Sequence, residues 1–154
     1  MARTKIDLSQ IAGIKSEESL LDTFNRIETN NQRIICFVLS GTVNQGLQSP
    51  EIRFPFSGTI TGVYASCRNP GNSDTIIEVQ KCSQQSIDSA LESEWESIFS
   101  QNLIIESNNK SSNTSALKAV IATPDVNLND HFRINILESG QLSDLTIEIE
   151  IKTY

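Results

Sequence analysis

Cysteine and histidine are scarce in this 154-residue chain, which holds three of the former and one of the latter. Cys36, Cys67 and Cys82 form no Cys-x-x-Cys pair, and together with His131 they match no spacing typical of a zinc site. The odd count leaves at least one cysteine unpaired within the chain, and so sparse a set favours reduced thiols over a disulfide scaffold. The sequence therefore predicts no metal site and no bound cofactor.

Catalytic motifs are missing as well. His131 stands beside Asp130, but no serine lies in a Gly-x-Ser-x-Gly turn that would present a nucleophile to such a pair. In a strand, Glu92, Glu94 and Glu96 would share one face, yet no second carboxylate group can be placed opposite them for glycoside hydrolysis. No glycine-rich phosphate loop is present. We therefore predict that the chain is not an enzyme.

Long apolar runs and an excess of positive charge are also absent. No stretch approaches the ~20 apolar residues of a membrane-spanning helix, and the first residues lack the apolar segment of a signal peptide. The 12 basic residues against 19 acidic ones give a formal net charge of −7, which disfavours nucleic acid and anionic membrane as partners. These features predict synthesis in a cytoplasm.

Short strands dominate the chain from residue 34 onward. In 145–151, leucine and isoleucine alternate with polar side chains, which is the pattern of a strand with one buried and one solvated face. The 132–136 segment has the same period, and the turn-rich connection 138–144 predicts that these two strands pair. The other candidate strands are 34–40, expected to be covered on both faces with Cys36 buried, and 51–56, 58–66, 75–81, 95–99, 103–105 and 116–122.

About eight short strands at regular intervals, with almost no helix after residue 33, predict an all-β fold. We expect residues 34–154 to form one domain, an antiparallel β-sandwich of jelly-roll type. Antiparallel sheets with one solvated face more often serve recognition than catalysis.

Residues 1–33 predict an N-terminal arm and a short amphipathic helix. Ser16 can cap the helix, with Glu17 and Glu18 in its positive first turn. About three turns are too few for a stable isolated helix, so the apolar stripe needs a surface to pack on, either the chain's own sheet or another subunit. The candidate contact residues of this segment are Leu8, Ile11, Ile14, Leu20, Phe24 and Ile27.

Aromatic residues leave open a saccharide site, which needs an exposed aromatic platform with polar side chains around it. Tyr64 and Trp95 are the candidates, and the loops 69–74 and 107–115 are rich in asparagine and serine. Trp95 precedes an apolar pair, so it could instead belong to the core or to an interface.

The order of segments resembles a known family. Arg53-Phe-Pro-Phe-Ser-Gly-Thr-Ile-Thr-Gly-Val-Tyr-Ala-Ser66 precedes an Asn-Pro-Gly turn and the 75–81 strand, and 126–140 leads to a closing Leu-Thr-Ile strand. An apolar strand ending in Val-x-Ala-Ser, a Pro-containing turn, an Asp-x-Phe-x-Ile-x-Ile strand and a Leu-Thr-Ile strand resemble the small β-sandwich module of siphophage tail and baseplate proteins from Gram-positive hosts. The likeness covers residues 34–154.

The N-terminal piece is similar to the start of lactococcal phage receptor-binding proteins, whose shoulder domain anchors them in the baseplate. The chain shows no segment like the glycine-periodic neck or the saccharide-binding head of that family. The resemblance thus implies a non-enzymatic virion protein of the tail tip or baseplate, made in the host cytoplasm, that contacts other tail proteins. A homo-oligomer, trimeric or higher in the virion, is expected. The alternative is a host-recognition module that binds cell-wall saccharide.

Overall fold

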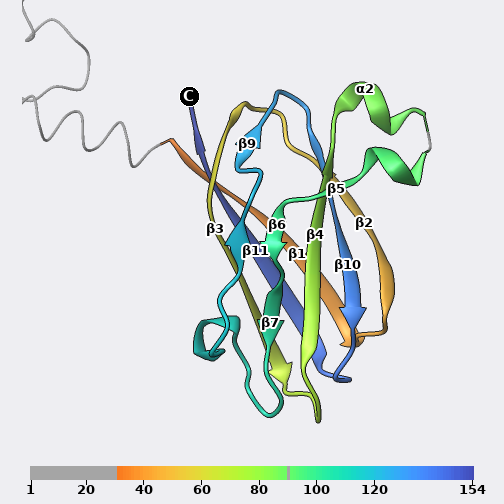
Figure 1. Ribbon diagram of the computed structural model, residues 1–154, viewed down its shortest axis with the longest axis vertical. Coiled ribbons are helices and arrows are strands. Elements are labelled where there is room, and N and C mark those ends of the chain that lie inside the picture. The colour runs from red at the N-terminus through yellow and green to blue at the C-terminus, as the bar shows by residue number, and fades with distance from the viewer. Residues whose placement is uncertain (1–30, 90) are drawn as a thin grey trace, which may run out of the picture. The chain divides into compact units, whose positions relative to one another are not determined.

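The computed structural model describes residues 31–89 and 91–154, and Arg33–Tyr154 form a compact β unit of two main sheets (Figure 1). Sheet A has the strand order β1-β11-β3-β9, and sheet B has the order β2-β10-β4-β5, with β7 also paired to β4. The strands of sheet A are β1 (Gln32–Thr42), β3 (Gly58–Asn69), β9 (Asp125–Val126) and β11 (Ser143–Thr153). Those of sheet B are β2 (Gly46–Arg53), β4 (Thr75–Cys82), β5 (Glu96–Ser97), β7 (Leu103–Ile105) and β10 (His131–Glu138).

Short elements fill the connections between the long strands. A small third sheet joins β6 (Phe99–Gln101) to β8 (Val120–Ile121). One turn of α-helix, α2 (Gln84–Ile87), and the 3-10 turns η2 (Glu92–Glu94) and η3 (Ser112–Thr114) complete the described part. Ser83 caps α2 by accepting a hydrogen bond from the Ser86 amide, as a short helix start requires.

The chain changes sheet at most of its connections. β1, β3, β9 and β11 lie in sheet A, while β2, β4 and β10, which lie between them in the chain, belong to sheet B. This alternation is the jelly-roll topology, in which two interleaved Greek keys form a sandwich. The predicted all-β, antiparallel jelly-roll-type sandwich is therefore confirmed. Eleven strands instead of about eight form in the described residues, and five of them have only two or three residues.

The core lies between the two sheets and is built by strand alternation. In β11, Leu145, Ile147, Ile149 and Ile151 are fully buried, while the residues between them stay at least partly accessible. The inward side chains of β10 meet them from sheet B. Burying such a side chain stabilises the fold by about 1.5–3 kcal/mol, so these two central strands dominate the core.

The expected pairing of the last two strands is wrong. β10 pairs with β2 and β4, and β11 pairs with β3, so the two strands face each other across the core. The connection between them crosses an end of the sandwich, where the Ser139 hydroxyl donates to the Val43 carbonyl and the Gly140 amide to the Thr75 hydroxyl. A side chain on Gly140 would collide with the Ser73 carbonyl. The close approach of two loops therefore explains the glycine and directs the chain to the other sheet.

The expectation that the first strand is covered on both faces is also wrong. β1 alternates strictly, with Ile35, Phe37 and Leu39 buried and the residues between them exposed. Cys36 points outward and is exposed instead of buried. β1 lies at the edge of sheet A, where no described strand covers its outer side.

Several boundaries differ from those expected. β1 continues to Thr42 and β2 begins at Gly46, so only three residues connect them, and β2 ends before Phe54. Of the predicted 116–122 strand only β8 forms, because the Ser115 hydroxyl donates to the Ile104 carbonyl and the Ala116 amide to Glu106, which hold that stretch as a loop. The predicted helix falls within residues 1–30, outside the described residues.

Candidate functional site

The two aromatic residues expected to form a platform lie on different sheets. Tyr64 is on β3 in sheet A, whereas Trp95 follows η2 and enters β5 at the edge of sheet B. They cannot act as one saccharide platform, so each has to be considered with its own neighbours. The predicted contact residues of the N-terminal segment, Leu8, Ile11, Ile14, Leu20, Phe24 and Ile27, lie outside the described residues.

Trp95 packs against a buried arginine on the outer face of sheet B. The guanidinium carbon of Arg133 lies 4.1 Å from the centre of the Trp95 ring, in the range of a cation–π interaction worth about 0.5–2 kcal/mol. One face of the half-buried indole is therefore occupied by the protein itself. Trp95 is better explained as a packing residue than as a free platform for a sugar.

Arg133 is the centre of this cluster, although it lies on the outward side of β10. It is only 5% exposed, and a charge so deeply buried is costly unless it is paired. Its Nη2 donates to the Glu92 carboxylate at 2.5 Å and its Nε to the Gln80 side-chain carbonyl at 2.7 Å. Glu92 and Trp95 thus cover Arg133 on the outer face of sheet B.

The polar groups continue along the same face. The Gln80 amide donates to Glu78 at 2.8 Å, and Asn135 donates to the same carboxylate at 3.0 Å. Each of these groups has a partner within the row. The arrangement therefore suits a structural network better than acid–base chemistry, which needs a group aimed at a substrate.

The contact with Arg133 shifts the pKa of Glu92. The hydrogen bond from Arg133 is the main cause that lowers the pKa of the Glu92 carboxyl; desolvation opposes it in part, and the positive charge of Arg133 adds to it. The predicted row of three glutamates on one strand face is wrong, because Glu92–Glu94 form a 3-10 turn and only Glu96 belongs to a strand. The Trp95 amide closes that turn by donating to the Glu92 carbonyl.

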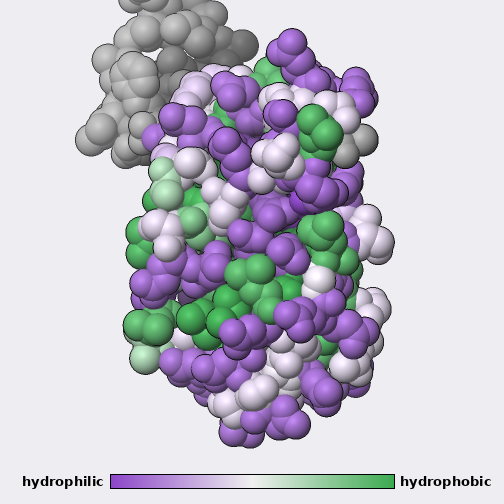
Figure 2. Space-filling model, turned by 45° about the vertical axis from the view of Figure 1, so that its right-hand side comes forward, coloured by the Kyte–Doolittle hydropathy of each residue, from purple (hydrophilic) through white to green (hydrophobic). Residues whose placement is uncertain are grey.

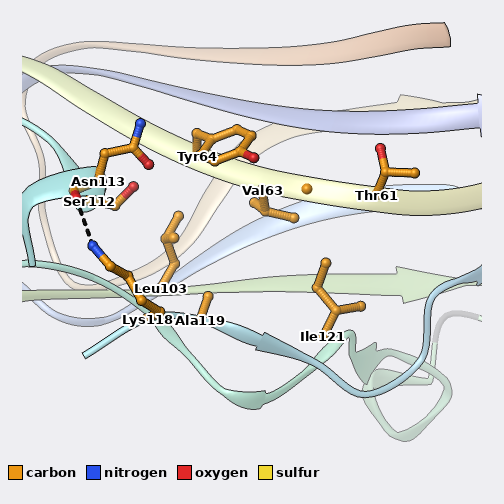
Figure 3. Close-up of a pocket in the computed structure, with 10 residues that line it drawn as sticks. Thr61, Val63, Tyr64, Leu103, Ser112, Asn113, Lys118, Ala119 and Ile121 are labelled. Atoms are coloured by element: carbon orange, nitrogen blue, oxygen red, sulfur yellow. Dashed lines mark hydrogen bonds between the residues drawn. The ribbon is translucent and has the colours of Figure 1, made fainter. Parts of the chain in front are cut away.

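Tyr64 lies in a different setting, beside two shallow grooves. The first is bounded by β3, Leu103 of β7 and the segment from Lys118 to Ile121 (Figure 3). The second runs along the outer face of sheet A, between Tyr64, Ser111 and Glu148. Tyr64 is 37% exposed and its ring lies over Gly62, where a side chain would collide with it. The Tyr64 side chain therefore borders both grooves.

The groove in Figure 3 carries both apolar and polar groups. Its lining includes the apolar residues Val63, Leu103 and Ile121 and the polar residues Thr61, Tyr64 and Asn113. Lys118 donates to the Asn113 carbonyl at 2.6 Å and so joins two parts of the loop. The volume of about 210 Å³ is smaller than the roughly 300–1,000 Å³ typical of small-molecule sites. The groove is therefore too small to enclose a typical small-molecule ligand.

His131 and Asp130, the neighbours considered for catalysis, serve other contacts. The Asp130 side chain is buried and accepts the Asn127 amide at 2.8 Å, which fixes the turn before β10. The His131 Nε2 atom lies 3.1 Å from the Gln84 side-chain oxygen. Within the described part, no three acidic, histidine or cysteine side chains are grouped as metal ligands.

The three cysteines differ sharply in their surroundings. Cys67 and Cys82 are buried, and desolvation raises the pKa of both thiols, with Lys110 partly opposing the shift at Cys67 and Glu51 adding to it at Cys82. β3 and β4 belong to different sheets, so the turn between these two cysteines does not form a hairpin. All three thiols are free, and only that of Cys36 is exposed.

The remaining surface is mixed in character. Figure 2 brings forward the side on which β2 and β10 lie in Figure 1, and hydrophobic residues gather across its middle between hydrophilic ones.

The role of Arg133 was not predicted from the sequence, where it is one polar residue between Phe132 and Ile134. Alternation along the strand indicates that Arg133 faces outward, but the neighbouring sequence does not show that residues from elsewhere in the chain cover it.

None of the described helices is long and apolar enough to cross a membrane. No protein-family model matches the chain, and a search of the curated proteins finds no match either.

Proposed function

We propose that this chain is a non-enzymatic structural protein of a phage tail tip or baseplate, acting through protein–protein contacts. The observation that carries the proposal is the exposed apolar side of β1, where Ile34 and Val38 are 61% and 62% exposed. An exposed apolar row on a long strand is a candidate contact surface. The jelly-roll fold and the resemblance of residues 34–154 to siphophage tail modules support the same role.

Virions of a phage that encodes this chain provide the direct test. Immunogold labelling with an antibody to the chain should mark the tail tip, and the chain should co-purify with tail proteins. Virions without label and without the chain would exclude the proposal.

The candidate contact residues of the N-terminal segment can be tested in the full chain. Replacing Leu20 and Phe24 by aspartate should reduce incorporation into tails, because both residues belong to the predicted apolar stripe. The matched control replaces Ser19 and Thr23, at the same spacing, by aspartate. Equal incorporation of the two double variants would show that the stripe is not an assembly surface.

A second candidate function is binding of host cell-wall saccharide, and the grooves beside Tyr64 favour it. An exposed ring with hydroxyl and amide groups around it is a suitable surface for a sugar. Calorimetric titration with purified wall polysaccharide should show saturable binding that is lost in Tyr64→Ala. Trp95→Phe should keep that binding, because its ring position packs on Arg133. No binding by the unmodified chain would remove this candidate.

A further inference from the structure

We propose that two copies of this chain associate by antiparallel pairing of their β1 strands, about a two-fold axis that passes beside Cys36. The pairing would join the two four-stranded A sheets into one continuous sheet. This inference concerns a second copy of the same chain and does not depend on a role in a phage tail.

The first observation is that β1 lacks the protection found at the other sheet edges. A strand edge carries unpaired backbone groups, and proteins usually protect it with charges, proline, bulges or very short strands. β2, the long edge of sheet B, contains Pro50, Glu51 and Arg53, and its register with β10 is irregular. The opposite edges are formed by β9, β5 and β7, which have two or three residues each.

β1 differs from all of these edges. It has 11 residues, and from Ile34 to Ser40 it contains neither a charged residue nor a proline. Its burial alternates regularly over Ile34–Leu39, as in a strand without a bulge. No described strand pairs with its second edge. A long, uncharged edge of this kind is a template for another strand.

The second observation is that the outward row of β1 is complementary to itself. Ile34, Cys36 and Val38 lie on the outer side of sheet A. In an antiparallel pair centred on Cys36, Ile34 of one copy stands opposite Val38 of the other, and the two Cys36 residues face each other. Cross-strand apolar pairs of this type contribute about 0.2–1 kcal/mol each.

These features favour a second copy over an unrelated strand. A two-fold axis needs a row whose residues are complementary when the row is reversed, and apolar residues on either side of one central cysteine provide it. The chain carries a net charge of −7, so two copies repel in general, and contact is least opposed where the surface is uncharged. A single strand pair is also a small interface compared with about 1,600 Å² for a standard complex. We therefore expect the dimer to depend on protein concentration.

The first experiment is sedimentation equilibrium of the full chain over a range of concentrations. The average mass should rise from the 17.0 kDa of one chain towards twice that value. Val38→Lys, which places a charge in the outward row, should remain a monomer. Ser66→Lys is the matched control, because Ser66 is also exposed on the outer face of sheet A but lies on β3. Circular dichroism should show that both variants are folded.

The second experiment uses Cys36 as a reporter of register. Cross-strand Cα atoms lie about 4.5–5.5 Å apart, within the roughly 4.4–6.8 Å that a disulfide spans. Diamide should therefore link two chains, because the two thiols lose two electrons and two protons and one diamide is reduced to the hydrazine. Cys36→Ser should abolish the linked dimer, since the other two cysteines are buried.

Four results would overturn the proposal. They are a constant mass of one chain, a trimer or larger closed oligomer, association of Val38→Lys equal to that of Ser66→Lys, and failure of diamide to link chains that do associate. Hydrogen exchange of β1 amides distinguishes what covers the strand. Protection that rises with concentration supports a second copy, whereas protection already complete in a monomer assigns the edge to another segment of the same chain.

Discussion

Outward-facing side chains on the two sheets differ in burial. Cys82 lies on the outward side of β4, next to the paired row of Gln80 and Arg133. It is buried, and its thiol donates to the Ser83 carbonyl. Cys36 lies on the outward side of β1 and is exposed. Alternation along a strand therefore decides which side chains face the core, but burial of the other side chains depends on whether a segment covers that sheet.

The contrast extends to charge. On sheet B a positive charge is buried and satisfied by hydrogen bonds to Glu92 and Gln80 and by the ring of Trp95. At β1 apolar side chains are exposed instead. A covered face can thus contain a charge that has partners, while an uncovered apolar edge is available to another molecule.

The largest expected effect is the difference in stability lost when an inward or an outward isoleucine is replaced. Ile134→Ala should lower the free energy of unfolding by about 2–5 kcal/mol, because it leaves a cavity at a fully buried position. Ile34→Ala is the matched control, and it should change stability by no more than about 0.5 kcal/mol at its exposed position. Urea unfolding measures both variants. Similar losses would mean that β1 is covered in solution.

The next effect tests the covered face of sheet B. Arg133→Ala should cost about 1–3 kcal/mol of stability, because it removes a stacked ring contact and two charge-assisted hydrogen bonds. Arg133→Lys should recover only part of this, since an ammonium lacks the planar fork of a guanidinium. Arg68→Ala, at an exposed position, is the control. Fluorescence of Trp95, the single tryptophan, should change in both Arg133 variants.

Thiol chemistry gives a third comparison of the same two faces. At neutral pH and low protein concentration, Ellman's reagent should modify Cys36 at least about tenfold faster than Cys67 or Cys82. Burial raises the pKa of the Cys67 and Cys82 thiols. A higher pKa reduces the fraction of reactive thiolate at neutral pH, by about tenfold for each pKa unit. Cys36→Ser should remove the fast phase and leave two slow thiols. Three fast thiols in the native protein would contradict the buried positions.

The smallest effect is the pH dependence of the Glu92 contact. Because Arg133 lowers the pKa of the Glu92 carboxyl, this contact adds stability at pH values above the usual pKa of glutamate. The contribution is lost as the pH falls through the lowered value. Carbon-detected NMR should place the Glu92 midpoint below that of an ordinary glutamate and return it towards normal in Arg133→Ala. Equal midpoints in the two proteins would mean that the ion pair is absent in solution.

Much of the β unit was predictable from local pattern, and the candidate site was not. The isoleucine alternation of β11 identified inward residues correctly, because side-chain direction in a strand depends only on position. Tyr64 and Trp95 were identified as aromatic candidates, but their separation on two sheets and the stacking of Trp95 on Arg133 follow from contacts between distant segments. Sequence spacing carries no information about such contacts.

The sequence by itself determined that this protein forms short strands with one buried face, since alternation and turn residues act locally. Only the tertiary structure decided which strands pair. The 138–144 connection looks like a hairpin turn, yet Leu142 is buried and the Val43 amide donates to its carbonyl, which carries the chain across to sheet A. Tertiary structure also decided what covers each outer face, because a strand specifies its two sides but not its neighbours. That difference leaves Arg133 buried and Cys36 exposed.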